Sequence, residues 1–262
     1  MRNFKTLLAS LFLALPLFAS AQLTQKVVDL PTRAGVTQRM LVITPAQPKA
    51  AVVLLAGGHG GLQMAMDGSM QWGKGNFLVR SRERFAEQGL VVAVVDAPSD
   101  KQAAPYLAGS RQSAEHVADL KAVIAWLRES AKVPVWLVGT SRGTQSAAYV
   151  ATELAGSDSP DGIVLTATIL NDRRSRAVPA MPLSKIRVPL LVVHHEQDAC
   201  AACLFSDMSL LMSQLKGNPR HELIAFKGGQ STGDPCEAMA YHGFNGIEAD
   251  VVSQIALWIN KK

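Results

Sequence analysis

Short runs of hydrophobic residues alternate along this chain with longer amphipathic segments. Ala51–Leu55 and Leu90–Val95 are continuously apolar, which is typical of parallel strands covered by helices on both faces. Segments between such runs, for example Arg111–Glu129, place apolar residues along one helical face. This pattern predicts an α/β fold: one mostly parallel sheet of about eight strands, flanked by helices on both faces.

A β-hairpin around Arg33-Ala34-Gly35 is predicted to open the domain, and strands and helices then alternate. The segment Leu170–Val188, between the sixth and seventh strands, is too short for a large lid. We therefore expect a fairly open site, covered mainly by the loop Gly60–Asn76. The predicted strands are Lys26–Leu30, Gln38–Ile43, Ala51–Leu55, Leu90–Val95, Val135–Val138, Ile163–Ile169, Leu190–Val193 and His221–Phe226. The predicted helices are Phe77–Gln88, Arg111–Glu129, Thr144–Leu154 and Ile247–Ile259.

The stretch Gly139-Thr140-Ser141-Arg142-Gly143 lies between a predicted strand and a predicted Ala-rich helix. A serine on such a turn is held in a strained conformation with its hydroxyl exposed, and the two glycines let strand and helix approach closely. A serine at this point could instead be an ordinary helix N-cap. The flanking strand and helix favour Ser141 as a nucleophile.

A serine nucleophile needs a general base, and the base needs an acid that orients it. His242 lies in the loop between the last strand and the last helix, and Asp198 follows the strand Leu190–Val193 at its carboxyl end. Asp172, just after the sixth strand, is the alternative acid. Other residues of the same types have more ordinary interpretations. His194 and His195 are the alternative bases, but they precede Asp198 on the same strand end and are expected to be packing residues or to surround the site. His116 is expected to be a structural residue on the polar edge of a helix, His221 structural, and Asp96 a loop-organising residue that pairs with Arg142.

Residues 1–21 have the layout of a secretory signal peptide, and residues 22–262 form the predicted domain. Arg2 and Lys5 precede an apolar run that is too short to span a bilayer, and Ala19-Ser20-Ala21 is typical of a cleavage site. We therefore expect an exported protein, periplasmic or secreted, without stable membrane association after cleavage. The formal net charge is +5, and the basic residues are scattered, so nucleic acid is not an expected partner.

The three cysteines, Cys200, Cys203 and Cys236, flank the candidate acid and base in the sequence. If Asp198 and His242 meet, the loops that carry Cys200 and Cys236 meet as well, which predicts a disulfide between these two cysteines and leaves Cys203 free. Cys200–Cys203 is the alternative pairing, since C-x-x-C can close on itself.

The chain resembles the α/β-hydrolase superfamily over essentially its whole predicted domain. The resemblance rests on G-T-S-R-G at 139–143, V-V-H-H-E-Q-D at 192–198 and G-D-P-C-E-A-M-A-Y-H-G-F at 233–244. It implies an α/β-hydrolase fold with Ser141 as nucleophile, His242 as general base and then acid, and Asp198 as its orienting partner. The chain is most similar to small lidless serine esterases and dienelactone-hydrolase-like proteins, but it has a serine where cytosolic dienelactone hydrolases usually have a cysteine.

An acyl-transfer site also needs two N–H donors for the oxyanion. The resemblance implies the N–H of Arg142 as one donor, and the glycine-rich segment 56–61 offers Gly58 or His59 as the other. That segment could also be a simple flexible turn. Four apolar residues of the following loop are candidates for a substrate-binding wall, or for ordinary loop packing. They are Met64, Met66, Met70 and Trp72.

The leading hypothesis is a serine hydrolase that cleaves a small-molecule carboxylic ester or thioester without cofactor or metal. Two other classes stay open. One is a metal-binding or redox protein that uses His194, His195 and the three cysteines. The other is a non-catalytic binding protein on a hydrolase fold. The substrate and the oligomeric state are left open by the sequence.

Overall fold

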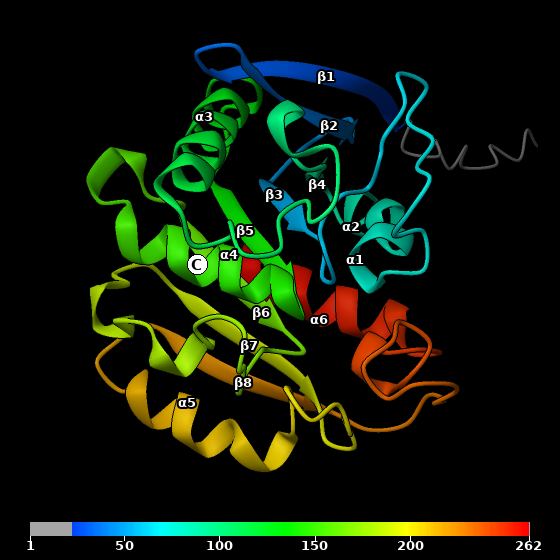
Figure 1. Cartoon of the computed structure of the whole chain (residues 1–262), viewed down its shortest axis with the longest axis vertical. Helices are drawn as coiled ribbons and strands as arrows, with labels where there is room; N and C mark the ends of the chain where they lie inside the picture. Colours follow the sequence, from blue (N-terminus) through cyan, green and yellow to red (C-terminus); the bar gives the residue numbers. More distant parts are fainter. Residues whose placement is uncertain (1–22, 262) are drawn as a thin grey trace, which may run out of the picture.

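The computed structural model describes residues 23–261, so the predicted signal peptide lies outside the described residues. Its centre is an eight-stranded sheet in the order β1-β2-β4-β3-β5-β6-β7-β8 (Figure 1). β1 and β2 pair antiparallel, β2 meets β4 antiparallel, and all later pairs are parallel. The strands are β1 (Thr24–Arg33), β2 (Val36–Thr44), β3 (Ala50–Leu55), β4 (Leu90–Val95), β5 (Val135–Thr140), β6 (Gly162–Thr166), β7 (Leu190–His195) and β8 (His221–Phe226). The predicted fold class is therefore confirmed.

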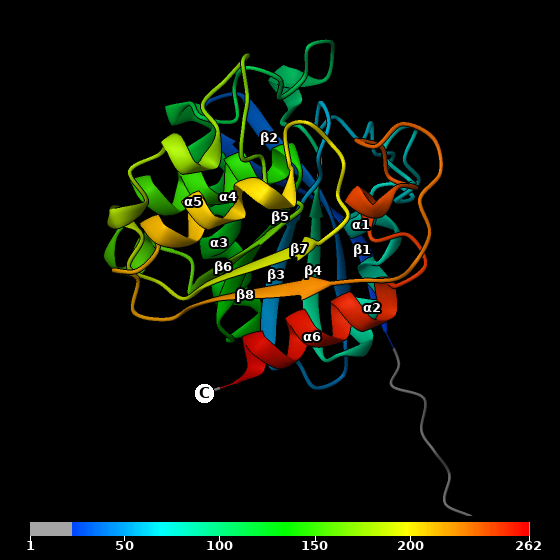
Figure 2. The same cartoon turned by 90° about the horizontal axis from the view of Figure 1, so that it is seen from below.

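Helices cover both faces of the sheet, which explains the continuous apolar strands (Figure 2). α3 (Ala114–Ala131), α4 (Arg142–Glu153) and α5 (Met208–Gln214) pack on one face. α1 (Phe77–Arg80), α2 (Arg82–Glu87) and α6 (Glu248–Asn260) pack on the other. Neighbouring residues of β3 divide between the two cores: Val53 belongs to the first and Val52 to the second. Burial of each such side chain contributes about 1.5–3 kcal/mol.

The helices differ from the predictions at three places. The predicted helix Phe77–Gln88 is two short helices that meet at Ser81. α3 begins at Ala114 because the Ser113 side chain accepts a hydrogen bond from the His116 N–H and caps the helix. α5 was not predicted: it has seven residues, of which only Met208 and Leu211 are buried, and so it is too short to show a clear helical period.

α4 packs closely against β3 and β5 at the serine turn. A Cβ atom added to Gly143 would lie 1.9 Å from the Leu55 carbonyl oxygen, and one added to Gly139 would lie 2.3 Å from the Gly143 carbonyl oxygen. Neither position can hold a side chain unless the backbone moves. The two glycines of the motif are therefore required by the packing of this turn.

We predict that Gly143→Ala lowers the free energy of unfolding by about 3 kcal/mol, because the added methyl group collides with backbone that cannot rotate away. Gly217→Ala is the matched control, since a Cβ at Gly217 meets no atom within 4 Å. Urea unfolding of the two variants and the parent measures the difference. Equal midpoints for Gly143→Ala and Gly217→Ala would contradict the packing argument.

Candidate active site

Ser141 occupies the turn between β5 and α4 with φ 50° and ψ −124°, a conformation that side chains rarely adopt. Three hydrogen bonds hold this conformation. The Ser141 N–H donates to the Thr166 carbonyl at 3.0 Å, and the Ser141 carbonyl accepts from the Thr144 hydroxyl at 2.6 Å and from the Thr144 N–H at 2.9 Å. The Ser141 side chain makes no capping hydrogen bond to α4. The simple N-cap interpretation of Ser141 therefore does not fit this turn.

His242 and Asp198 come together from loops 44 residues apart in sequence. His242 Nδ1 lies 2.9 Å from Asp198 Oδ2, and both residues are buried. The second carboxylate oxygen, Oδ1, accepts the Cys200 N–H at 3.0 Å. Since a carboxylate only accepts, the hydrogen bond places the proton of a neutral imidazole on Nδ1 and leaves Nε2 as an acceptor. His242 Nε2 has no hydrogen-bond partner among residues 23–261.

Ser141 and His242 line one cavity of about 400 Å³ at the carboxyl ends of the strands. No described hydrogen bond joins the serine hydroxyl to His242 Nε2. The rest of the lining comes from the loop after β3, from α1, from the segments that bear the disulfide, from the residues on either side of Ser141 and from the segment after β6. These lining residues are Gly57, Gly58, Trp72, Gly73, Gly75, Asn76, Phe77, Thr140, Arg142, Ile169, Cys200, Ala202, Cys236, Glu237, Ala238 and Gly243.

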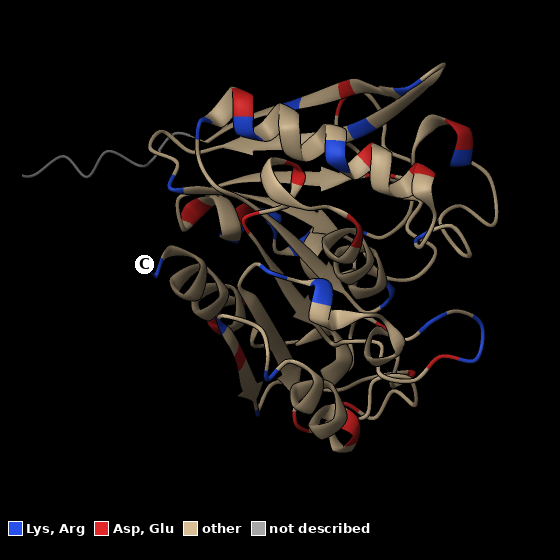
Figure 3. Cartoon of the chain, turned by 90° about the vertical axis from the view of Figure 1, so that its left-hand side faces the viewer, with Lys and Arg blue, Asp and Glu red and all other residues tan. Residues whose placement is uncertain are grey.

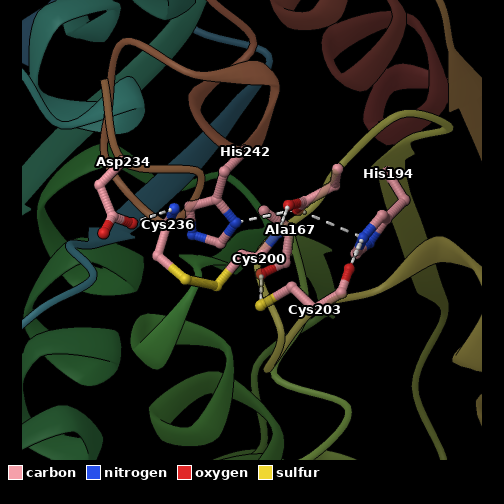
Figure 4. Close-up of a disulfide and its surroundings, with 8 residues drawn as sticks. Ala167, His194, Cys200, Cys203, Asp234, Cys236 and His242 are labelled. Carbon is pink, nitrogen blue, oxygen red and sulfur yellow. Dashed lines mark hydrogen bonds and ion pairs between the residues drawn. A yellow bond between two sulfur atoms is a disulfide. The ribbon is translucent and has the colours of Figure 1, made fainter. Parts of the chain in front are cut away.

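A disulfide joins Cys200 to Cys236, as the sequence analysis predicted, and connects the loop of Asp198 to the loop of His242 (Figure 4). Cys203 is free and buried, and burial raises the pKa of its thiol well above the usual value. Its Sγ contacts the Ala167 carbonyl oxygen at 3.4 Å. The bridge therefore restrains the relative position of the two loops, while Cys203 is a packing residue.

The loop that follows β3 reaches the cavity through Gly57 and Gly58. A Cβ atom added to Gly57 would lie 2.9 Å from Ser141 Cβ and 3.5 Å from Asn76 Nδ2. His59 does not line the cavity: its ring lies against Trp72 and Tyr106, with centroid distances of 3.9 and 4.4 Å. Of the two sequence candidates for the second donor, the structure brings only Gly58 to the cavity, and it adds Gly57.

Arg111 lies behind this loop and fixes its peptide groups. Its Nη2 donates to the Ala56 carbonyl at 2.9 Å and to the Gly58 carbonyl at 3.2 Å, and its Nη1 donates to the Ser146 hydroxyl at 3.0 Å. In a trans peptide the C=O and N–H point in opposite directions. The Gly57 N–H, in the same peptide group as the Ala56 carbonyl, therefore points away from Arg111. No sequence pattern points to Arg111, because an arginine bound to backbone carbonyls leaves no motif.

Asp96 organises the covering loop, as predicted, but does not pair with Arg142. Its carboxylate accepts the N–H groups of Leu62 and Met64 at 2.6 and 2.8 Å. Arg142 instead pairs with Asp172 at 2.8 Å. The predicted pairing of Asp96 with Arg142 is therefore wrong, because the Asp96 oxygens are occupied by backbone donors of this loop.

Asp172, the alternative acid, bonds to residues of α4 and of its own loop. Partial burial raises the pKa of Asp172, but hydrogen bonds from Ser175 and Arg142 outweigh this effect and hold that pKa well below its usual range. Gln145 Nε2 donates to the same carboxylate at 3.0 Å. No described hydrogen bond links Asp172 to His242, whose Nδ1 is bonded to Asp198.

Of the four apolar residues predicted to form a substrate-binding wall, only Trp72 lines the cavity. Met64 and Met70 are buried in the core and pair as a short β-bridge, and the Met66 side chain is 63% exposed. A β-turn between Met64 and Met70 turns this part of the loop back on itself. The methionines therefore fulfil the packing alternative, and the aromatic ring of Trp72 is the part of the loop that reaches the cavity.

The other histidines surround the site or lie away from it. His194 is buried, with Nε2 2.7 Å from the Cys203 carbonyl and 3.5 Å from Asp198 Oδ2. The His195 ring stacks on Tyr241, 4.4 Å between centroids. His116 was predicted on the polar edge of a helix, and this is wrong: the residue is buried. Burial and the nearby Arg111 lower the pKa of His116 to about 3. None of the three lines the cavity of Ser141.

One group of metal-ligand types occurs in the part of the chain that the structure describes: Cys200, Cys203 and His242 have atoms within 4.8 Å of one another. Cys200 is oxidised in the disulfide, and so it cannot supply a thiolate. That leaves only two ligand atoms of this group, Cys203 Sγ and His242 Nε2, since His242 Nδ1 is bonded to Asp198. This group does not fit the four-ligand pattern of a structural zinc site.

The strand order, the strained serine between β5 and α4, and the cavity at the carboxyl ends of the strands define an α/β-hydrolase fold. No protein-family model matches the chain, and no curated protein sequence does. Solved structures do match. The chain is therefore assigned to this fold by its structure, at low sequence identity.

Three of the similar structures illustrate the likeness. An esterase from Pyrococcus furiosus has 15% identity and a TM-score of 0.64, with 90% of each chain covered. A dienelactone hydrolase from Anabaena variabilis has 12% identity and a TM-score of 0.60, with 91% of this chain and 96% of its own covered. A lidless α/β serine hydrolase from Xanthomonas campestris has 16% identity and a TM-score of 0.57, with 92% and 97% covered. Within residues 23–261, no helix is long and apolar enough to cross a membrane.

We predict that replacing both disulfide cysteines, in the double variant Cys200→Ser/Cys236→Ser, lowers the free energy of unfolding by about 3–4 kcal/mol. The bridge closes a loop with a sequence separation of 36, and its loss restores the entropy of that loop in the unfolded chain. Cys203→Ala is the control, because it keeps the bridge and costs about 1 kcal/mol through a small cavity. Urea unfolding measures both. A double variant as stable as the parent would contradict this role.

Proposed function

We propose that this protein is a serine hydrolase that cleaves a carboxylic ester, or a thioester, through an acyl-enzyme on Ser141. The observation that carries the proposal is the buried His242–Asp198 hydrogen bond, which leaves His242 Nε2 without a described partner in the cavity that Ser141 also lines. A base whose second nitrogen is held by a carboxylate, beside a strained serine, is the arrangement that activates a hydroxyl. The names of the similar structures, esterases and dienelactone hydrolases among them, support the same class.

The proposed reaction uses each residue in turn. His242 Nε2 takes the proton from the Ser141 hydroxyl as the oxygen attacks the ester carbonyl, and then gives this proton to the leaving alcohol. Asp198 keeps the imidazole in the required tautomer and stabilises its cationic form. A water molecule, deprotonated by the same histidine, then attacks the acyl group and releases Ser141. No cofactor takes part in these steps.

The negative oxygen that forms in each attack needs donors fixed in advance. We assign the N–H of Arg142, at the start of α4, and the N–H of Gly57 or Gly58. The Arg142 N–H has no described acceptor, and the N–H groups of Gly57 and Gly58 have none either. Arg111 supports this assignment, since it holds the Ala56 and Gly58 carbonyls on the far side of the loop. Loss of one such donor typically costs about 10²–10³ in kcat.

Export is part of the proposal. The predicted signal peptide at residues 1–21 lies outside the described residues, and a disulfide between Cys200 and Cys236 is the kind of bond that persists in an oxidising compartment. A periplasmic or secreted location follows. A mature protein that begins at Gln22, detected by N-terminal sequencing, is the expected observation.

We predict that Ser141→Ala lowers kcat on short para-nitrophenyl esters by at least about 10⁴-fold, because no other nucleophile replaces the hydroxyl. Ser213→Ala, at an exposed position of α5, is the matched control and keeps the parent rate. A fluorophosphonate label with peptide mapping provides a second measurement, with Ser141 as the modified residue. Equal rates for the parent and Ser141→Ala, together with no label on Ser141, would contradict the proposal and leave the binding-protein alternative.

A second prediction distinguishes the two candidate acids. Asp198→Asn keeps the size of the side chain but removes the charge that orients His242, so kcat falls by about 10⁴-fold. Asp172→Asn is the control: it weakens the contact with Arg142 and lowers kcat far less, by about tenfold or less. The ratio of the two losses, measured on the same ester, is the readout. A larger loss in Asp172→Asn would reassign the acid.

A further inference from the structure

A second cavity, of about 370 Å³, shares Arg142 with the cavity that Ser141 lines. Arg142 lines both cavities, so the two adjoin. The second cavity is lined by three further arginines, and no acidic residue lines it. These arginines are Arg111, Arg174 and Arg176. Two of them come from the loop that follows β6, the projecting segment coloured blue and red in Figure 3.

The positive charge around this cavity exceeds the negative charge that the fold supplies. Asp172 pairs with Arg142 and is the one carboxylate bonded to these arginines within residues 23–261. Arg174 and Arg176 form no ion pair with a described residue. Arg111 is 5% exposed, donates only to carbonyl and hydroxyl oxygens, and has an Nε without a described partner. A buried cation without a counter-charge is costly, and an anion nearby offsets that cost.

The electrostatics of Arg111 agree with this charge excess. Burial and the nearby Arg142 lower the pKa of Arg111 to about 9. Both causes disfavour the charged guanidinium, and the second arises from another arginine that lines the same cavity. An anion between the two would reverse the second effect.

The wall of this cavity is held by hydrogen bonds. Gln112 Nε2 and Gln145 Nε2 both donate to the Arg176 carbonyl, at 2.8 and 3.0 Å. Gln145 Nε2 also contacts the Ser175 hydroxyl at 2.8 Å. These bonds attach the loop that carries Arg174 and Arg176 to α4 and to the segment before α3. The backbone around the cavity is therefore already fixed, so binding does not carry the entropic cost of ordering this loop.

We propose that this arginine cavity binds an oxyanion, that is, a carboxylate, phosphate or sulfate group. Planar guanidinium groups match such groups with paired hydrogen bonds, which lysines do not. Because Arg142 lines both cavities, the group can belong to the substrate itself, as the far end of an acyl or alcohol part. The substrate source rests on the proposed function, whereas binding of a separate anion does not.

The first test compares two para-nitrophenyl esters with the same glutaryl chain on the full mature protein. One is mono-para-nitrophenyl glutarate, which is anionic, and the other is its neutral methyl ester. We expect kcat/KM to favour the anionic ester by about tenfold, as for a charge-assisted hydrogen-bonded contact. In Arg174→Ala/Arg176→Ala the preference falls to about onefold. Arg173→Ala is the matched control, since Arg173 is an exposed arginine of the same loop that does not line the cavity, and it keeps the preference.

The second test does not require catalysis. Isothermal calorimetry on Ser141→Ala, with glutarate and with inorganic phosphate, detects binding of a free anion, and the same titration on Ser141→Ala/Arg174→Ala/Arg176→Ala shows whether these arginines are needed. Circular dichroism confirms that the loop variants are folded. Binding that needs the two arginines, without an ester preference, would assign the cavity to a separate anion.

The outcomes separate the two proposals. Ester hydrolysis with neither an anionic preference nor arginine-dependent anion binding would overturn the oxyanion site and leave the proposed function in place. If no ester is hydrolysed, the proposed function fails, and calorimetry alone tests the oxyanion site. Arginine-dependent binding of an anion supports that site, and the absence of binding overturns it.

Discussion

The close approach of α4 to β3 and β5 is the constraint on which the site depends. Gly143 lies against the Leu55 carbonyl, where no side chain fits, and this contact brings the first turn of α4 to the carboxyl end of β3. The chain can make so short a connection from β5 only if Ser141 adopts a positive φ. The same contact places the loop after β3 beside Ser141. One packing contact therefore positions the serine, the start of α4 and the glycine loop together.

The candidate acid and base come from segments that the sheet alone does not bring together. Asp198 follows β7, and His242 lies in the long connection between β8 and α6. Their hydrogen bond is buried, and both carboxylate oxygens have donors, one from His242 and one from the Cys200 N–H. Cys200 also takes part in the disulfide to the segment that carries His242. Cys200 therefore positions the Asp198 carboxylate through its N–H and restrains the two loops through its disulfide.

The sequence predicts those parts of this structure that depend on local pattern. Continuous apolar runs such as Leu90–Val95 identify the buried strands, because only strands covered on both faces lack polar positions. The glycines at 139 and 143 identify the serine turn. The sequence does not predict which side chains pair with one another in the loops. Asp96 and Asp172 both follow strands, and nothing in their neighbours tells which of them meets Arg142. That outcome depends on the path of the covering loop, whose N–H groups occupy Asp96.

The same limit explains Met64 and Trp72, which are eight positions apart in one loop: Met64 is buried in the core, and only Trp72 lines the cavity. A loop that turns back on itself as a β-bridge changes which side chains face inward, and apolar residues fill the core or the cavity equally well. Arg111 has two sets of contacts that no sequence pattern indicates. It holds the glycine loop by carbonyls on one side, and it faces the arginine cavity on the other. A buried cation with only neutral acceptors raises the positive potential around Ser141, and this potential would favour the negative charge formed in the acyl transfer that we propose there.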